Sequence, residues 1–504
     1  MPIRANQLTE KADYQHLILE ELRDRNGYVI RNAQTDWSAE YAMDTGMLFK
    51  FLNDTQPEQM DRLQKFYGDK TEKTVVNFIN NEITKSSRSL VDVLKNGVEF
   101  GNGVTVQLMY RRPATAYNEN QNRLYGLNIL SVMEEVYHKE GERIDLVLFL
   151  NGLAIFTVEL KCNTTGQTYE KAIKQYKQER TDSRTFRFKS GVFTAFAMDL
   201  NEVYFCTRLK GADSFFMPFN IGEQKEADKP YSVSKGNPHN EDGINVSYMW
   251  EKIWTKEKII MLIERFIFIE KKSEKNADSG KVTTKETLIF PRYHQLRAIE
   301  RLTDDIRRNR TSQNYLIEHS AGSGKTNTIA WLAHILASIH DAEDKNIFNN
   351  IIIITDRIIV DRQLQDAVKG IDHKSGQLKV MDDKCDSADL AAALRGNTKI
   401  IVTTIHKFFY IMENKLLTAL KDKTFAVLID EAHSSTEGDL MRAVTTTFAG
   451  GENGRVVNDG KDDAENGENG EEITTEDRIV EEVRKSGKQP NVTMIAFTAT
   501  PNGA

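Results

Sequence analysis

The stretch HSAGSGKT, from His319 to Thr326, decides the fold of the second half of this chain. An apolar run ends just before it and a helical pattern of apolar residues follows it, which is the setting of a phosphate-binding loop. Gly322 and Gly324 allow backbone N–H groups to point at phosphate oxygens. Lys325 can reach the β- and γ-phosphates, and the Thr326 hydroxyl can bind Mg²⁺. The alternative is a glycine-rich turn that caps an ordinary helix.

An acidic pair follows another apolar run further along the chain. Residues 425–429 (FAVLI) predict a buried strand, and DEAH follows at 430–433. In open α/β sheets, ligands bind beyond the carboxyl ends of the strands. We expect Asp430 to hold Mg²⁺ through water and Glu431 to orient or deprotonate the attacking water. A solvated acidic loop is the alternative interpretation.

Five apolar runs in this half alternate with helical patterns, which predicts a parallel sheet wrapped by helices. The runs are 315–317, 351–354, 400–402, 425–429 and 492–497. Polar residues follow two of these runs, Thr355-Asp356-Arg357 and TTIHK at 403–407, and polar loop caps are one interpretation of them. Upstream, FPRYHQ at 290–295 offers a ring for base stacking, and Gln295 can bond N6 and N7 of adenine.

The first half contains a predicted β-hairpin that carries acidic residues. Apolar runs within 142–163 flank Asn151-Gly152, a strong hairpin signal. Asp145 lies on the first strand, and Glu159 and Lys161 share one face of the second because they are two residues apart. Two carboxylates and the Leu160 carbonyl offer the oxygen ligands that Mg²⁺ prefers. The metal would activate water, and Lys161 would position that water. The alternative is that these charged residues form ordinary salt bridges on an exposed strand.

The loop length of this hairpin decides whether the two carboxylates can meet. A plain two-residue loop pairs Asp145 with Val158, which turns Asp145 away from Glu159. We therefore predict a three-residue loop, Leu150–Gly152, with left-handed Gly152 in a bulge and Asp145 opposite Thr157. A strict two-residue hairpin without a compensating bulge would contradict a shared metal site.

A basic segment follows the hairpin. Residues 171–189 contain seven Lys and Arg residues and two acidic residues, which gives a net charge of +5. Lys171, Lys174 and Lys177 recur at helical spacing, and Arg180 follows them. Such a patch is expected for contact with a phosphate backbone, and a solvated helix face is the alternative.

Composition sets outer limits on function. The 504 residues are 39% hydrophobic and 28% charged, with a net charge of −7, so any nucleic-acid surface must be a local basic patch. The N-terminus lacks an apolar signal region and no run is long enough to span a bilayer, so we expect a cytoplasmic protein. Three distant cysteines suggest neither a disulfide framework nor a zinc site. Polar residues predict a linker at 271–287 and an acidic surface insertion at 450–477.

Taken together, these segments resemble two known families. FPRYHQ, HSAGSGKT, DEAH and TAT (498–500) resemble the Q motif and motifs I, II and III of superfamily 2 helicases. The first half resembles the restriction subunit of type I restriction-modification enzymes, with its PD-(D/E)xK nuclease. The text that carries this second resemblance is YAMD (41–44), FL (51–52), TQP (55–57), KNG (95–97), DLVLFLNG (145–152), VELK (158–161), TGQT (165–168), AIKQY (172–176), FMPFN (216–220) and YMW (248–250).

The resemblance implies an α/β protein with a nuclease-like domain at 1–270 and one RecA-like lobe at 288–504. It implies ATP and Mg²⁺ as cofactors, and duplex DNA, a methyltransferase subunit and a specificity subunit as partners. It leads us to expect a second lobe outside this chain. The residues that it adds to those above are, for ATP, Arg292, Ser323, His433, Thr498 and Thr500; for DNA, Arg357, Thr404 and Lys407; and for the nuclease, Gln175 and Tyr176.

The Gln-x-x-x-Tyr element of the family departs from its pattern here, because Glu179 stands where Tyr is expected and Tyr176 is the substitute. Two other functions stay open. The chain could be a different superfamily 2 ATPase with a degraded nuclease fold, or a fragment that only docks to a methyltransferase core. Cleavage with Mg²⁺ and ATP would separate these possibilities.

Overall fold

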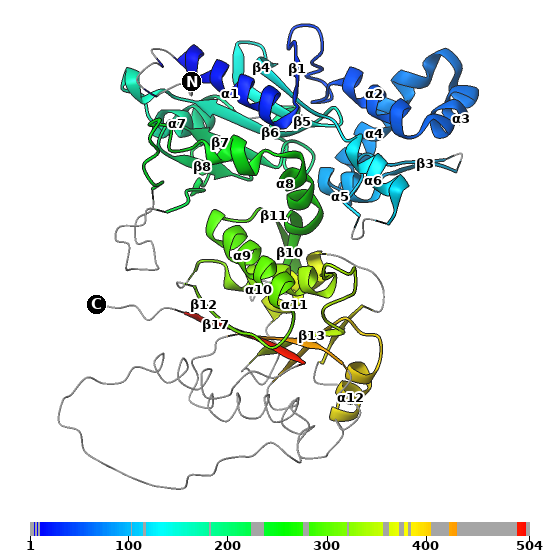
Figure 1. Cartoon of the computed structure of the whole chain (residues 1–504). Coiled ribbons are helices and arrows are strands. Elements are labelled where there is room, and N and C mark those ends of the chain that lie inside the picture. Colours follow the sequence, from blue (N-terminus) through cyan, green and yellow to red (C-terminus); the bar gives the residue numbers. More distant parts are fainter. Residues whose placement is uncertain are drawn as a thin grey trace, which may run out of the picture. The chain divides into compact units, whose positions relative to one another are not determined.

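The computed structural model describes residues 5, 8, 11–101, 103–113, 117–180, 183–222, 236–275, 282–319, 322–355, 362–371, 377–381, 385–404, 423–430 and 491–499. The chain forms two compact units (Figure 1). Residues Met1–Glu270 and Thr284–His294 make up the first, and residues Lys271–Thr283 and Gln295–Ala504 the second. No helix in the described part of the chain is long and apolar enough to cross a membrane.

The first unit is built on a seven-stranded mixed sheet of order β1-β4-β5-β6-β7-β8-β9. Its strands are β1 (Val29–Arg31), β4 (Leu130–Lys139), β5 (Glu142–Leu150), β6 (Leu153–Leu160), β7 (Thr194–Met198), β8 (Val203–Cys206) and β9 (Met217–Pro218). Strands β6 and β7 are parallel, while β5 is antiparallel to both of its neighbours. Helix α7 (Tyr169–Glu179) connects β6 to β7 and packs on β6, β7 and β8, as Figure 1 shows.

The remaining elements of this unit are mostly helices. They are α1 (Lys11–Asn26), α2 (Thr45–Thr55), α3 (Pro57–Tyr67), α4 (Thr71–Thr84), α5 (Leu90–Asn96), α6 (Glu119–Gly126) and α8 (Lys256–Met261), with a small ribbon of β2 (Val98–Phe100) and β3 (Val104–Val106). Every residue of β6 is buried. A strand covered on both faces explains why its sequence is apolar almost throughout instead of alternating.

The predicted polar linker 271–287 is occupied by strands over much of its length. Strands β10 (Phe268–Lys275) and β11 (Val282–Ile289) pair as a two-stranded ribbon. The Thr and charged residues of this ribbon are compatible with strand structure, although they supply no apolar signal.

The second unit contains the predicted parallel sheet, with six strands in the order β12-β17-β16-β13-β15-β14. The strands are β12 (Asn314–His319), β13 (Asn350–Thr355), β14 (Leu378–Val380), β15 (Ile400–Thr404), β16 (Phe425–Asp430) and β17 (Val492–Ala499). All five predicted strands are confirmed, and β14 is additional. The helices are α9 (Tyr293–Asn309), α10 (Lys325–Ala337), α11 (Arg362–Ile371) and α12 (Ser387–Arg395).

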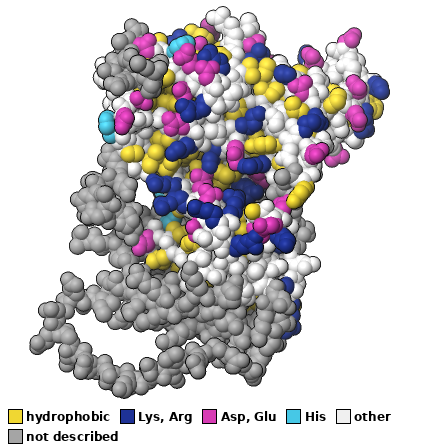
Figure 2. Space-filling view, viewed as in Figure 1, with side chains coloured by type: hydrophobic (Ala, Val, Ile, Leu, Met, Phe, Trp, Pro, Cys, Tyr) yellow, Lys and Arg dark blue, Asp and Glu magenta, His cyan; other side chains and the backbone are white. Residues whose placement is uncertain are grey.

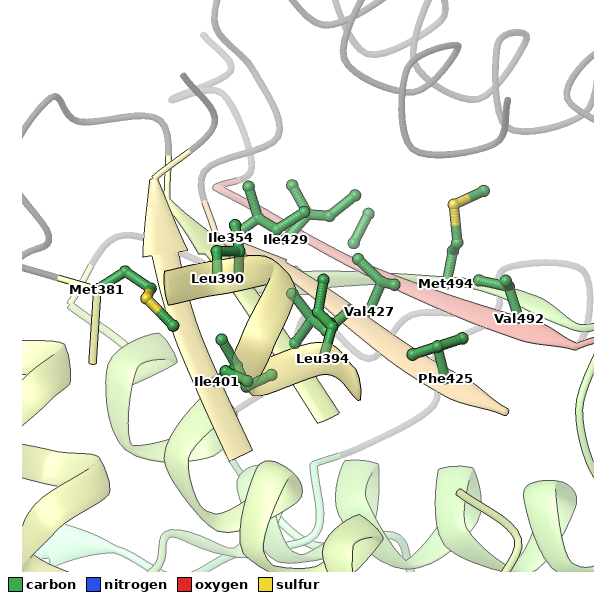
Figure 3. Close-up of a cluster of buried hydrophobic side chains, with 13 residues drawn as sticks. Ile354, Met381, Leu390, Leu394, Ile401, Phe425, Val427, Ile429, Val492 and Met494 are labelled. Atoms are coloured by element: carbon green, nitrogen blue, oxygen red, sulfur yellow. The ribbon is translucent and has the colours of Figure 1, made fainter. Parts of the chain in front are cut away.

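One face of this sheet is sealed by helix α12. Leu390 and Leu394 of α12 lie fully buried over Ile401, Val427 and their neighbours in the sheet (Figure 3). Buried branched side chains from parallel strands explain the continuous apolar runs in the sequence. This packing fixes the strand ends, where the polar residues of interest begin.

Candidate functional site

The β5–β6 hairpin brings Asp145 and Glu159 together by a route other than the predicted one. Leu150 pairs with Leu153, so the loop has two residues, Asn151 and Gly152, and the predicted three-residue loop is wrong. Both loop residues have positive φ, 51° and 81°, which matches the tight turn favoured by Asn-Gly.

A bulge further along the hairpin restores the shared face. Phe149 pairs with Ala154 but Leu148 pairs with Phe156, so Ile155 is left without a partner across β5. Because Leu146 pairs with Val158, the next pair in this register is Asp145 with Glu159. The predicted partner of Asp145, Thr157, is therefore wrong. The condition that the two carboxylates share a face is met by the compensating bulge.

Asp145 and Glu159 are both buried, and each carries a different set of bonds. The backbone N–H of Leu160 donates to Asp145 Oδ2 over 2.7 Å, and the Lys11 ammonium pairs with Asp145 Oδ1. Arg180 Nε donates to Glu159 Oε1 over 2.9 Å. Among the described residues, Glu159 Oε2 has no hydrogen-bond partner.

The electrostatics of the pair follow from this burial. Burial, together with the charge of Asp145, raises the pKa of Glu159 to about 8, although Arg180 and Lys161 act in the opposite direction. Burial also lowers the pKa of the Lys161 ammonium. A metal cation bound between the two carboxylates would favour the charged form of Glu159, since opposite charge at close range offsets desolvation.

Lys161 and helix α7 lie on the same side of the site. Lys161 Nζ donates to Gln175 Oε1 over 2.8 Å and to the Leu160 carbonyl oxygen over 3.2 Å. Gln175 of α7 is thus brought to the predicted lysine. Tyr176 is fully buried and shares a 3.0 Å hydrogen bond with Thr157 Oγ1. Its hydroxyl is therefore used in packing α7 against β6.

Helix α7 lies where the basic spacing predicted a helix, and contact of its lysines with DNA stays a prediction. The helix exists, and Lys171 and Lys174 are exposed on it, while Lys177 is half-buried. Arg180, predicted to contact DNA, is instead buried against Glu159 and the Arg143 carbonyl oxygen. It follows the last helical residue, so its side chain does not continue the lysine face. Positive and negative groups are interspersed on the face drawn in Figure 2, so any DNA surface there is local.

Two residues of this site were missed by sequence reasoning. Lys11 lies 134 residues before Asp145, and nothing in the sequence of α1 distinguishes it from a surface lysine. Arg180 was assigned to the surface because it ends a basic run. Of the two, only Arg180 could have been inferred from the sequence. A buried acidic residue such as Glu159 needs a nearby cation, and Arg180 lies in the basic segment that follows the strand.

The oxygen atoms of this site fit a hard divalent cation. Asp145, Glu159 and the Leu160 carbonyl offer oxygen ligands, and Glu159 Oε2 is a buried acceptor that has no hydrogen-bond partner among the described residues. In the described part of the chain no group of three or more His, Cys, Asp or Glu is placed to hold a metal ion. A metal here would therefore rest on two carboxylates, one carbonyl and water.

The second site is the phosphate-binding loop of the other unit. Gly322 and Gly324 have φ of 74° and 91°, a conformation that suits glycine, and α10 begins at Lys325. The Gln295 amide donates to the Gly324 carbonyl oxygen over 2.9 Å and to Thr328 Oγ1 over 3.2 Å. Gln295, predicted to read adenine, thus also supports the loop.

The loop lies near the acidic strand end. Lys325 Nζ is 3.7 Å from Asp430 Oδ1, so the predicted phosphate and Mg²⁺ residues are brought together. His319, which stands where Gly or Ala is usual, shares a 2.9 Å hydrogen bond with Ser323 Oγ. The imidazole thereby ties the start of the loop to its middle.

The other predicted residues of this unit are placed unevenly. Thr404 is buried at the end of β15, and Thr498 lies in β17. Arg292 is half-buried just before α9. The predicted residues that lie outside the described part of the chain are Arg357, Lys407, Glu431, His433 and Thr500.

Comparison with known proteins confirms the resemblance seen in the sequence. Residues 7–214 match the model of the type I restriction enzyme R protein N terminus. Residues 294–453 match the model of the SWI2/SNF2 ATPase, which implies a RecA-like domain and ATP use.

Individual relatives carry matching names. The MjaVIIIP endonuclease subunit of a type I restriction enzyme from Methanocaldococcus jannaschii is 25% identical over 78% of this chain and 38% of its own length. The MjaIXP endonuclease subunit from the same organism is 23% identical over 74% of this chain and 35% of its length. The SsaAORF53P endonuclease subunit from Staphylococcus saprophyticus is 25% identical over 65% of this chain and 31% of its own length. The chain thus spans about a third of the relatives it matches.

Proposed function

We propose that this chain carries the nuclease and the first motor lobe of a type I restriction endonuclease subunit, which cleaves foreign unmethylated duplex DNA after ATP-driven translocation. The observation that carries the proposal is the register of the β5–β6 hairpin, which places Asp145 and Glu159 on one face beside Lys161, in a region that matches the restriction-subunit model. The nuclease domain is assigned to 1–270, the linker to 271–287 and the lobe to 288–504.

In the proposed nuclease site, Asp145, Glu159 and the Leu160 carbonyl would hold Mg²⁺, and the ion when bound would activate water and stabilise the charge that develops on the phosphate. Arg180 holds Glu159 Oε1, which leaves Oε2 for the ion. Gln175 holds the Lys161 ammonium over 2.8 Å, so that lysine is positioned to orient water or phosphate.

In the proposed motor, the loop amides and Lys325 bind the ATP phosphates, while Thr326 and Asp430 hold Mg²⁺. The 3.7 Å separation of Lys325 and Asp430 supports this assignment. The relatives are named as endonuclease subunits of type I restriction enzymes, so we propose assembly with methyltransferase and specificity subunits. An enzyme acting on DNA inside the cell fits the predicted cytoplasmic location.

The test is cleavage by the assembled restriction complex with Mg²⁺ and ATP. Asp145→Ala, Glu159→Ala and Lys161→Ala should each abolish cleavage while ATP-driven translocation continues. Asp54→Asn, which removes a charge from an exposed ion pair on α2, is the matched control and should cleave normally. Cleavage at the wild-type rate by Lys161→Ala would refute the nuclease assignment.

A further inference from the structure

Lys11 of helix α1 contributes a cation to the proposed nuclease site from a distant part of the chain. Its Nζ pairs with Oδ1 of Asp145, while Oδ2 of the same carboxylate is taken by the Leu160 N–H. The side chain of Lys11 is 34% exposed, whereas that of Asp145 is 2% exposed. Lys11 therefore lies between the buried carboxylate and solvent.

The atom that Lys11 covers is the one that a metal ion would need. Of the two Asp145 oxygens, Oδ2 already accepts a backbone hydrogen bond fixed by the strand, so Oδ1 is the oxygen available to another ligand. Glu159 is arranged in the same way, with Oε1 bound to Arg180 and Oε2 without a partner among the described residues. The site thus offers one oxygen from each carboxylate, and an ammonium group occupies the first.

Charge balance points in the same direction. The acidic side chains Asp145 and Glu159 share their surroundings with three basic side chains, Lys11, Lys161 and Arg180. Arg180 is 2% exposed and Lys161 is 7% exposed, so both are confined, while Lys11 can move into water. A divalent ion added to this group would repel all three cations, and Lys11 can leave at the lowest cost in desolvation.

We propose that the Lys11 ammonium occupies the place of the metal ion on Asp145 and is displaced when the ion binds, so that Lys11 weakens metal binding. This inference rests on the proposed nuclease function. A binding-competent state that is only partly populated reduces apparent affinity by the populated fraction, so removal of the competitor should raise affinity.

The experiment is a titration of the 504-residue chain with Mn²⁺ in the absence of nucleotide, with free Mn²⁺ measured by electron paramagnetic resonance. The binding lost in Asp145→Asn defines the site. Lys11→Met, which keeps an apolar stem, should bind Mn²⁺ roughly tenfold more tightly than the wild type at low salt. Lys11→Gln is a second uncharged variant with the same expectation, and Lys11→Arg, which retains a cation, should show no such gain.

Lys50→Met is the matched control, because Lys50 forms an exposed ion pair with Asp54 on α2 and its loss should leave Mn²⁺ affinity unchanged. Circular dichroism would verify that each variant is folded. Equal affinity of the wild type, Lys11→Met and Lys11→Gln at a site abolished by Asp145→Asn would overturn the role of Lys11 while leaving the nuclease proposal intact. Mn²⁺ binding that is unaffected by Asp145→Asn would overturn both.

Discussion

Gly324→Ala should weaken nucleotide binding much more than the neighbouring change Gly322→Ala. Both glycines have positive φ, which costs an alanine about 1–2 kcal/mol. At Gly324 an added Cβ would also lie 2.5 Å from Gln295 Nε2, whereas at Gly322 it would meet no described residue within 4 Å. Relief of that overlap requires Gln295 to move and give up its 2.9 Å hydrogen bond to the Gly324 carbonyl oxygen, a loss of about 1 kcal/mol.

The sum for Gly324→Ala is about 2–3 kcal/mol, or roughly a 30- to 150-fold rise in Kd, against roughly 5- to 30-fold for Gly322→Ala. The assay is titration of the chain with a fluorescent ATP analogue, with thermal unfolding to verify folding. In a Gln295→Ala background the two glycine changes should become equivalent, because the overlap is gone. Equal effects of Gly322→Ala and Gly324→Ala in the wild-type background would refute the reasoning.

Three further changes test the packing around these sites. Asn151→Ala should lower the free energy of unfolding of the first unit by about 3 kcal/mol in urea, because the hydrogen bonds of the buried side chain to Leu108, Asn128 and Ile129 are lost. Asn151→Gly loses the same bonds but adopts the turn conformation freely, so it measures the contribution of those bonds alone. Burial and the charge of Arg180 lower the pKa of His138 to about 4. The unfolded chain therefore binds more protons than the folded chain between about pH 6.5 and 4, and the free energy of unfolding should fall as the pH falls through that range. In His138→Gln, the urea midpoints at pH 7 and pH 5 should differ less than they do in the wild type. Leu394→Ala removes a fully buried side chain of α12 from the cluster that α12 forms with the sheet, and it should lower the free energy of unfolding of the second unit by about 2–5 kcal/mol. An unfolding midpoint equal to that of the wild type would contradict the packing.

Apolar patterning was sufficient to predict most of the second unit. The run 351–354 lies in β13, and the other apolar runs lie in strands of the same parallel sheet. Strands that are buried on both faces are apolar throughout, so each one gives a continuous apolar run in the sequence. Strand β14 was missed because LKV has three residues and a central lysine, too little for a periodic signal. The loop glycines were predictable since their chemistry is local.

The closeness of the candidate nuclease residues was predictable from the sequence, but their geometry was less so. Asp145, Glu159 and Lys161 lie close in sequence, so strand parity could link them. The actual register depended on a bulge at Ile155, which no local signal indicates, because Ile suits any buried strand position. Lys11 comes from a helix far along the chain, and only tertiary packing brings it to Asp145.

The bulge at Ile155 also bears on how the lengths of related chains can diverge. One end of the hairpin is fixed by the Asn151-Gly152 turn, where an added Cβ on Gly152 would overlap the Asp44 carbonyl oxygen. The other end is fixed by Asp145, Glu159 and their buried partners. The pairing register near the turn and the register near Glu159 differ by one residue, Ile155. Gain or loss of a residue at this point should therefore be tolerated in related chains without separating the carboxylates. Insertions or deletions should be selected against nearer to Glu159, where a change of one residue reverses the face that carries the site.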